Sequence, residues 1–213
     1  MTIVVDVLRA TSTIVQALDS GYERVFCCSE LDEARSLRDA LGDAVLAGER
    51  GARPIEGFDL GNSPREFVEP RARAVVLTTT NGTRAVAAAA AAGSESVLIG
   101  SLLNADAVAE AAQAAGVDST IVCAGVDGAF ALDDAYCAGR IAEAIGAART
   151  DAAEAAVILA RSFARPEDAL RAAQNPRQEG LGDDEIAWCA RVDVTAVVPR
   201  LVALRGSSAE LRA

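Results

Sequence analysis

The sequence predicts one α/β domain with an open central sheet, and three observations support this fold class. Short apolar stretches alternate with stretches of helical periodicity along much of the chain, as in proteins that pack helices on a β-sheet. The first apolar stretch, Ile3–Val7, is mainly β-branched, which is typical of a strand covered on both faces. With 213 residues, of which 51% are hydrophobic, the chain can bury a large core.

The end of this first strand predicts a ligand site. The stretch Val4–Thr13 passes from apolar residues to an acid, Asp6, an arginine, Arg9, and three consecutive hydroxyls. Helical spacing follows, which places Thr11 or Ser12 at the helix N-cap. Ligands of open α/β sheets bind beyond the carboxyl ends of the strands, where a helix N-terminus offers free N–H groups to an anion. Simple helix capping with an Asp6–Arg9 ion pair explains the same pattern equally well.

A long aperiodic segment follows the third predicted strand. Strands are expected at 25–28 and 44–47, with a helix between them that ends at Gly42. The next segment, Gly48–Pro64, contains four glycines and two prolines. A loop of this length inside a compact domain is usually functional, although an ordinary surface Ω-loop fits the composition too.

The fourth predicted strand repeats the opening pattern. Residues 74–77 lead into Thr78–Arg84, which contains four hydroxyls and an arginine, and then into an alanine-rich helix that runs to Ala92. A single N-cap side chain satisfies only one or two free N–H groups, so capping alone leaves several of these hydroxyls unexplained. We therefore expect an anion site here, formed with the first one at the same edge of the sheet.

The next elements supply scaffold and further acids. A strand at 97–99 and a helix from Asn104 to Ala115 read as scaffold. The strand at 120–123 runs into glycines, and Asp133 and Asp134 then open a helix that extends to residue 148. Acids in a first helical turn complement the helix dipole. The second of the two could instead bind a metal ion or handle a proton.

The C-terminal third gives weaker signals. Helices are expected at 152–163, from Pro166 onward and around Trp188, with a polar break at 175–180. Four valines between 192 and 198 indicate a late short strand. We expect these elements to cap the main sheet or to extend its edge, so the domain covers residues 1–213 with 150–213 as a helical C-terminal elaboration.

Composition excludes several classes of function. The net charge of −11 argues against nucleic-acid and anionic-membrane partners, whose binding depends on clustered positive charge. The chain has no histidine, and all 20 basic residues are arginines, which excludes histidine bases, lysine Schiff bases and P-loop lysines. The five cysteines lack C-x-x-C spacing, which argues against a disulfide framework and a zinc site. No apolar run is long enough to span a membrane and no leader is evident, so we expect a cytoplasmic protein.

The polar residues at the strand ends point to a phosphate, sulfonate or carboxylate ligand. Arginines, backbone N–H groups and hydroxyls bind such anions. Carboxylates beside the anion would repel it unless a hard cation lies between them, which indicates Mg²⁺ held by one or two acids together with ligand oxygens and water. Without histidine, phosphoryl chemistry would use metal-activated water or an aspartate nucleophile. The motifs of cysteine phosphatases, haloacid-dehalogenase-type phosphatases and P-loop proteins are missing.

Five motifs, in order and spacing, resemble the 2-phosphosulfolactate phosphatase (ComB) family. They are Val5–Thr13, Ala47–Arg50, Gly57–Pro64, Thr78–Ala85, and Cys123–Gly125 with Leu132–Gly139. The resemblance covers residues 3 to 146, with a weaker similarity at Cys189–Pro199. It implies a three-layer α/β/α fold around a mostly parallel, mixed sheet. It also implies Mg²⁺-dependent hydrolysis of 2-phospho-3-sulfolactate to 3-sulfolactate and phosphate, a step of coenzyme M biosynthesis.

The resemblance also suggests roles for individual residues. Asp6 and Glu49 are the expected Mg²⁺ ligands, with Asp6 as an alternative nucleophile, and Asp133 or Asp134 would assist the metal or the proton. The expected substrate-binding residues are Arg9, Thr11, Ser12, Thr79, Asn81, Gly82, Thr83, Arg84 and Gly125.

The leading hypothesis is thus a phosphoric monoester hydrolase that acts on a small anionic phosphoester. A homodimer is compatible with this hypothesis. The first alternative is a non-catalytic binder or sensor of a small phosphorylated or sulfonated anion. The second is a phosphatase for another small phosphoester.

Overall fold

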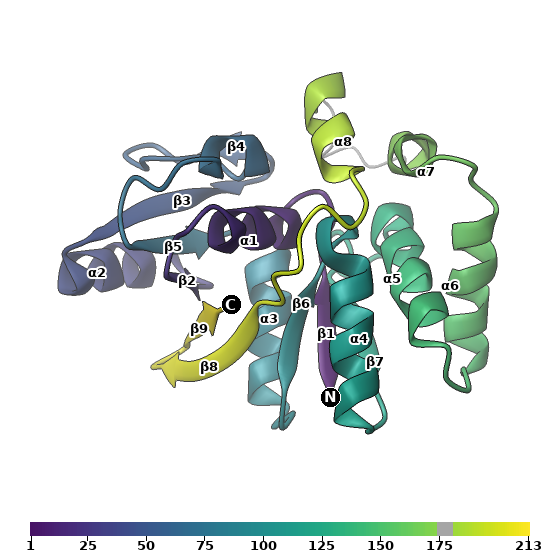
Figure 1. The fold of residues 1–213 in the computed structure, drawn as a ribbon. Coiled ribbons are helices and arrows are strands. Elements are labelled where there is room, and N and C mark those ends of the chain that lie inside the picture. The colour runs from purple at the N-terminus through teal and green to yellow at the C-terminus, as the bar shows by residue number, and fades with distance from the viewer. Residues whose placement is uncertain (174–180) are drawn as a thin grey trace.

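The computed structural model describes residues 1–173 and 181–213 and confirms the predicted three-layer α/β/α fold, with a nine-stranded mixed sheet between helices (Figure 1). The strands are β1 (Thr2–Val5), β2 (Arg24–Cys27), β3 (Ala44–Arg50), β4 (Arg53–Pro54), β5 (Ala74–Thr78), β6 (Val97–Gly100), β7 (Thr120–Cys123), β8 (Arg200–Arg205) and β9 (Ser208–Arg212). The helices are α1 (Ala10–Asp19), α2 (Leu31–Leu41), α3 (Gly82–Ala91), α4 (Ala105–Ala115), α5 (Leu132–Ile145), α6 (Asp151–Arg161), α7 (Pro166–Ala172) and α8 (Asp183–Cys189). Short 3₁₀ turns lie at Pro64–Phe67 and Leu102–Asn104.

The sheet consists of two parallel blocks joined by an antiparallel hairpin. The strand order is β4-β3-β5-β2-β9-β8-β6-β1-β7. Strands β3, β5 and β2 are parallel to one another, as are β6, β1 and β7. The β8–β9 hairpin pairs antiparallel with β2 on one side and β6 on the other. The mixed character of the sheet comes largely from this C-terminal hairpin.

The hairpin corrects the expected C-terminal organisation. Residues 192–198 form no strand, and the last strands begin at Arg200 and lie inside the sheet rather than at its edge. Residues 150–213 are therefore helical only as far as Cys189, because their final part completes the sheet. The signal for this hairpin is the Gly206-Ser207 pair between two strand-length runs, with Gly206 in the left-handed region at φ 63°. The expected polar break at 175–180 lies outside the described residues.

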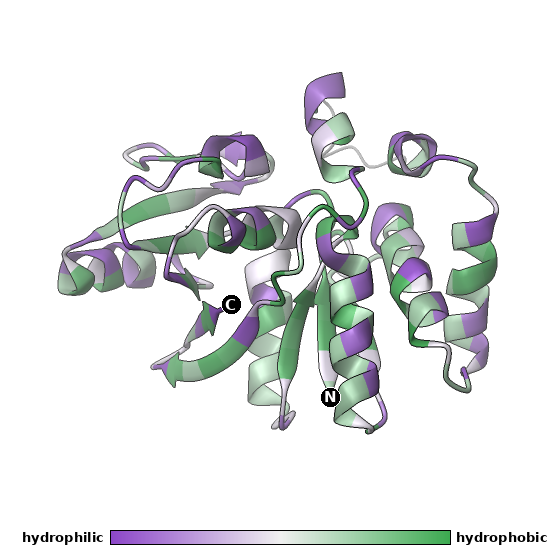
Figure 2. Cartoon of the chain, viewed as in Figure 1, coloured by the Kyte–Doolittle hydropathy of each residue, from purple (hydrophilic) through white to green (hydrophobic). Residues whose placement is uncertain are grey.

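Alternating side chains of the strands build the core on both faces of the sheet. In β1, Val4 packs with α1 and α3, whereas Ile3 and Val5 pack with α4 and α5. In β2, Val25 belongs to the first of these clusters, and Phe26 faces α2 on the opposite side. The strands are accordingly mostly green in Figure 2, while purple, hydrophilic segments gather at the turns and on the outer helices. This two-sided burial agrees with the β-branched strand pattern of the sequence.

The strands of both blocks direct their carboxyl ends toward the same region. In Figure 1 the two blocks run in clearly different directions. The segments that follow β1, β5 and β7, together with the end of β3, line one cavity there. The predicted convergence of strand ends is thus present, in a sheet whose two blocks are joined by a hairpin.

Two local expectations were wrong. Helix α1 begins at Ala10 with Arg9 at the N-cap, so Thr11 and Ser12 lie inside its first turn. Strand β3 continues to Arg50 and pairs with the short β4, so Glu49 belongs to a strand and not to a loop that begins at Gly48. None of the helices in the described part of the chain has the length and apolar character that a membrane span requires.

Candidate active site

An open cavity lies where the two strand blocks converge. The segments after β1, β5 and β7 reach it, together with the end of β3 and the start of α5. Its lining comprises Asp6, Leu8, Arg9, Glu49, Ala52, Asn62, Thr80, Asn81, Gly125, Val126, Ala131, Asp133, Asp134 and Leu181. Seven of the predicted site residues are among these: Asp6, Arg9, Glu49, Asn81, Gly125, Asp133 and Asp134.

Asp6 follows β1 directly and lies at the start of α1. Its Oδ1 accepts a hydrogen bond from the backbone N–H of Ala10 at 3.3 Å, so the first turn of the helix holds the carboxylate. The pKa of Asp6 is raised to about 7, mainly by burial and also by the charges of Asp133 and Glu49, while the Ala10 N–H and Arg9 act in the opposite direction. Asp6 is therefore an acid that can change its protonation state near neutral pH.

Asp133 and Asp134 open helix α5 and have different environments. Asp134 accepts hydrogen bonds from the backbone N–H groups of Val7 and Gly125, each at 2.9 Å, and so joins the segments that follow β1 and β7. Burial and the neighbouring Asp6 and Asp133 charges raise its pKa well above the usual value. Burial also raises the pKa of Asp133 to about 6. Three buried carboxyls that favour the protonated state thus face one cavity.

Glu49 is held firmly by its surroundings. Its Oε1 accepts a hydrogen bond from the Thr80 N–H at 2.6 Å, and its Oε2 accepts from the Ala52 N–H at 2.7 Å and from the Thr80 hydroxyl at 3.0 Å. The side chain is nearly buried and joins the end of β3 to the segment after β5.

Gly82 begins α3 and packs directly against Asp6, the acid that follows β1. A Cβ atom at this position would lie 2.5 Å from Asp6 Oδ2 and 2.4 Å from the Cβ of Ala10. The preceding residue, Asn81, accepts a hydrogen bond from the Asp127 N–H through its Oδ1 at 3.2 Å. The predicted involvement of Gly82 is therefore one of close packing against Asp6.

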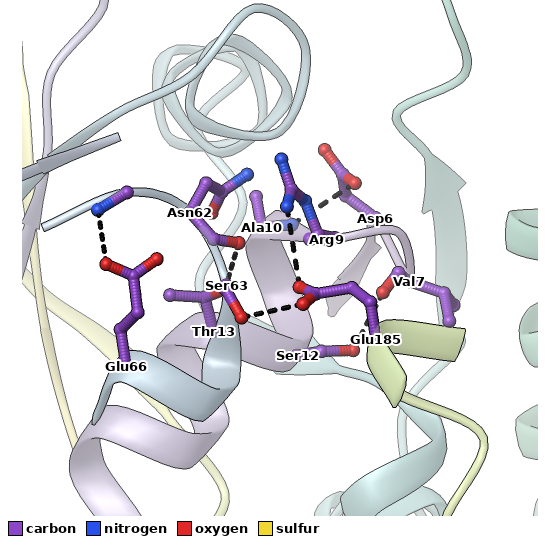
Figure 3. Close-up of polar contacts among 11 residues, drawn as sticks. Asp6, Val7, Arg9, Ala10, Ser12, Thr13, Asn62, Ser63, Glu66 and Glu185 are labelled. Carbon is purple, nitrogen blue, oxygen red and sulfur yellow. Dashed lines mark hydrogen bonds and ion pairs between the residues drawn. The ribbon is translucent and has the colours of Figure 1, made fainter. Parts of the chain in front are cut away.

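Arg9 reaches the cavity and is held by a residue from α8. Its Nη1 lies 3.4 Å from Glu185 Oε1, and Glu185 Oε2 accepts a hydrogen bond from the Ser63 hydroxyl at 2.7 Å (Figure 3). The carboxylate of Glu185 is nearly buried, so solvent screens this ion pair only weakly. The three side chains join α1, the segment before Pro64 and α8 at one side of the cavity.

Four predicted substrate-binding hydroxyls lie behind the cavity rather than in its lining. Thr11 donates to the backbone oxygen of Asp6 at 2.8 Å, and Ser12 donates to that of Val7 at 2.8 Å. In the turn between β5 and α3, the Thr83 hydroxyl donates to the Thr79 backbone oxygen at 3.0 Å, and the Thr79 hydroxyl accepts from the Thr83 N–H. These hydroxyls stabilise the two turns that carry Asp6 and Asn81.

Arg84 lies apart from the cavity lining. It is exposed in the first turn of α3. The pKa of Arg50 is lowered mainly by burial, and the nearby positive charge of Arg84 also lowers it. Arg50 donates to the Thr78 hydroxyl at 2.6 Å and to the Ser29 backbone oxygen at 2.9 Å. Arg50 and Arg84 therefore place positive charge beside the group of acids that faces the cavity.

Sequence reasoning did not select three residues that form part of the site, namely Asn62, Thr80 and Glu185. Asn62 was within a segment regarded as functional, and Thr80 was within a hydroxyl cluster, so both had a local signal. Glu185 had none, because an acid in the first turn of a short helix is ordinary and only tertiary packing brings it to Arg9.

The acids of the cavity fit a magnesium site that uses only two protein carboxylates. Within residues 1–173 and 181–213, no group of three or more metal-ligating side chains is arranged to hold an ion. Mg²⁺ commonly uses only one or two carboxylates and completes its shell with water and phosphate oxygens. Asp6 and Glu49 interact electrostatically at the same cavity, so this pair fits that requirement. A divalent cation would also relieve the repulsion among the buried acids.

The raised pKa values predict that the protein is more stable at low pH than at high pH when divalent cations are absent. A carboxyl whose folded-state pKa is raised binds more protons when folded, so its stabilising contribution is largest at low pH and is lost as pH rises through about 6 to 7. In EDTA, we expect the free energy of unfolding to fall by about 2 kcal/mol between pH 5 and pH 8. Urea unfolding at both pH values measures this, and Asp6→Asn should flatten the profile. An equal slope in the variant would contradict the assignment to Asp6.

Comparison with known proteins gives consistent matches along the chain. A family model described as 2-phosphosulpholactate phosphatase matches residues 1–203. A Deinococcus radiodurans protein named probable 2-phosphosulfolactate phosphatase is 41% identical over 210 residues, which cover 94% of this chain and 87% of that protein. A Thermus thermophilus protein of the same name is 41% identical over 209 residues, covering 93% and 86%. A Methanothermobacter thermautotrophicus protein named 2-phosphosulfolactate phosphatase is 38% identical over 199 residues, covering 92% and 84%.

Proposed function

The chain belongs to the 2-phosphosulpholactate phosphatase family, and we propose that it hydrolyses 2-phospho-3-sulfolactate to 3-sulfolactate and phosphate with the help of Mg²⁺. The observation that carries the proposal is the cavity in which Arg9 and four acids, Asp6, Glu49, Asp133 and Asp134, meet at the strand ends. The names of the relatives support the substrate, and the acids support the need for a cation.

The proposed substrate matches the charges around the cavity. It carries a phosphate, a sulfonate and a carboxylate, so it needs positive charge at more than one point. Arg9 supplies such charge inside the cavity, and Arg50 and Arg84 supply it beside the Glu49 end. Arginine suits this purpose because its planar guanidinium group can form two parallel hydrogen bonds to an oxyanion.

In this proposal Asp6 and Glu49 hold the Mg²⁺ ion. When bound, the ion would neutralise phosphoryl charge and make water more acidic. Asp6 then either accepts the proton of the attacking water or attacks phosphorus itself, and both roles need the ionised carboxylate. Asp133 lies beside Asp6 and has its pKa raised to about 6, which suits it to supply a proton to the leaving oxygen.

Phosphate release tests the proposed function. The purified protein with Mg²⁺ should release phosphate from 2-phospho-3-sulfolactate, and EDTA should abolish the release. Phospholactate, which lacks the sulfonate, should be a poorer substrate. Tight binding of phosphosulfolactate in calorimetry without turnover would instead indicate a binder or sensor, and turnover that is unaffected by EDTA would contradict the magnesium requirement.

Loss of the Glu185 charge is expected to weaken substrate binding more than chemistry. Glu185→Gln removes the negative charge that holds Arg9, so Arg9 should become less ordered. We expect KM to rise by about tenfold and kcat to change by less than threefold, because Arg9 would bind the substrate and the transition state about equally. Glu110→Gln, on the exposed face of α4, serves as the control. An unchanged KM would show that Glu185 does not position Arg9 for the substrate.

A further inference from the structure

Asn62 presents an amide nitrogen to the cavity. Its side chain is 5% exposed and its Oδ1 is buried, so the nitrogen is the polar end that can reach a ligand. Figure 3 shows this nitrogen directed toward Arg9 and Asp6, which line the same cavity. Within residues 1–173 and 181–213, no hydrogen bond joins Asn62 Nδ2 to another group. Polar groups in side chains this buried nearly always have partners, so the unpaired donor indicates a bound group.

Contacts that do not involve the amide fix its position. The Asn62 backbone oxygen accepts a hydrogen bond from the Thr13 hydroxyl at 2.9 Å. The next residue, Ser63, donates through its hydroxyl to Glu185 Oε2 at 2.7 Å, and the other oxygen of Glu185 lies 3.4 Å from Arg9 Nη1. One nearly buried carboxylate therefore holds both the segment that carries Asn62 and the guanidinium group of Arg9. Asn62 and Arg9 form a preorganised pair of donors at one side of the cavity.

The chemistry of this pair points to an oxyanion. The amide nitrogen donates hydrogen bonds, so its ligand must offer an acceptor, and the adjacent guanidinium group favours an acceptor that is negatively charged. The amide carries no charge, so it does not form an ion pair with Asp6 as a second arginine would. The Asn62 amide and the Asp6 carboxylate therefore both remain available to a substrate.

The phosphoryl group is the oxyanion that fits this position. Asp6, which is proposed to hold Mg²⁺ and to act at phosphorus, lies with Arg9 at the start of α1, and the Asn62 nitrogen is directed toward both. We propose that Asn62 is a catalytic residue whose Nδ2 donates a hydrogen bond to an oxygen of the phosphoryl group. This inference rests on the proposed phosphatase function. The phosphoryl oxygens carry charge in the transition state, and a donor that is fixed beforehand stabilises this charge without rearranging.

Asn62→Ala removes the donor and tests the proposal. We expect kcat to fall about 100-fold, the typical effect of losing one such donor. In calorimetry with Mg²⁺, the affinity for inorganic phosphate should fall about tenfold, and the affinity for 3-sulfolactate, which lacks the phosphoryl group, should change by less than about threefold. The melting temperature should stay close to that of the wild type, because neither polar atom of the amide has a partner in the described part of the chain.

Asn62→Asp provides a second variant, because aspartate keeps the shape of the side chain and replaces the donor with a charged acceptor. Repulsion of the anion should lower the phosphate affinity by about another tenfold relative to Asn62→Ala. Wild-type kcat and phosphate affinity in Asn62→Ala would overturn the proposal. A loss of 3-sulfolactate affinity in Asn62→Ala with unchanged phosphate affinity would overturn it too, since Asn62 would then bind the other end of the substrate.

Asn104→Ala is the matched control. Asn104 is fully buried at the start of α4, and its side chain bonds the Ser101 N–H and the backbone oxygens of Ile99 and Val197. Its replacement should lower the melting temperature and leave the phosphate affinity of the folded protein unchanged. The same result for Asn62→Ala would assign Asn62 a structural role and overturn the proposal. A wild-type protein that releases no phosphate overturns the proposed function, whereas the phosphate titration still decides whether Asn62 binds the oxyanion.

Discussion

Replacing Asp6 with asparagine is expected to lower kcat by about 1,000-fold. Asn can neither accept the proton of water nor attack phosphorus, and it is a weak ligand for Mg²⁺. The amide oxygen can still accept the hydrogen bond from the Ala10 N–H, so the start of α1 should remain intact. Phosphate release from 2-phospho-3-sulfolactate at saturating substrate measures the effect.

Stability measurements separate loss of chemistry from loss of structure in this variant. Removal of one acid relieves the repulsion with Asp133 and Glu49, so Asp6→Asn should be at least as stable as the wild type at pH 8. Asp39→Asn, at an exposed position of α2, provides a control that should change neither activity nor stability. An Asp6→Asn protein with activity within threefold of the wild type would remove Asp6 from the reaction.

Gly82→Ala is expected to have the second large effect, through packing. The added Cβ would lie 2.5 Å from Asp6 Oδ2 and 2.4 Å from the Ala10 Cβ, so either Asp6 or the start of α1 must move. Overpacking of a filled site costs about 1 to 3 kcal/mol. A displacement of the reacting group by about 1 Å can lower the rate by about 100-fold. Urea unfolding and kcat together measure both losses.

Gly182→Ala is the matched control for this change. No atom of residues 1–173 or 181–213 lies within 4 Å of a Cβ atom at Gly182, and its φ of −68° suits alanine. We expect this variant to be close to the wild type in stability and in kcat. Full activity of Gly82→Ala would mean that Asp6 does not need the position that it has beside α3.

The sequence was informative at the points where polar residues directly follow a predicted strand. Asp6, Glu49, Asn81 and Asp133 come from four separate segments, and the rule that ligands bind beyond the carboxyl ends of strands placed all four in one cavity. This prediction succeeded because it depends on strand direction within each parallel block. It does not depend on the order of the strands, which the sequence did not reveal.

The hydroxyl clusters show why local patterns are ambiguous. Threonine and serine after a strand bind anions in some proteins and bind the backbone of their own turn in others. Here Thr11 and Thr83 bond the backbone oxygens of Asp6 and Thr79. Periodicity could not separate these cases, because both place the hydroxyl at the same position in the chain.

Long-range packing accounts for the features that remained hidden. Glu185 reaches Arg9 across 176 residues of sequence, and the β8–β9 hairpin enters the middle of the sheet from the end of the chain. Short strands with few apolar residues, such as β9, give little periodic signal, and their place is set by the gap between β2 and β6. Such contacts have no signature in any single segment.

A crystal structure with Mg²⁺ and inorganic phosphate tests the central claim most directly, because the claim is that separate strand ends form one phosphoryl site. The account predicts the ion against Asp6 and Glu49 and the phosphate within hydrogen-bond distance of Arg9. Phosphate bound on another surface, with the cavity between Asp6 and Glu49 free of metal, would contradict it.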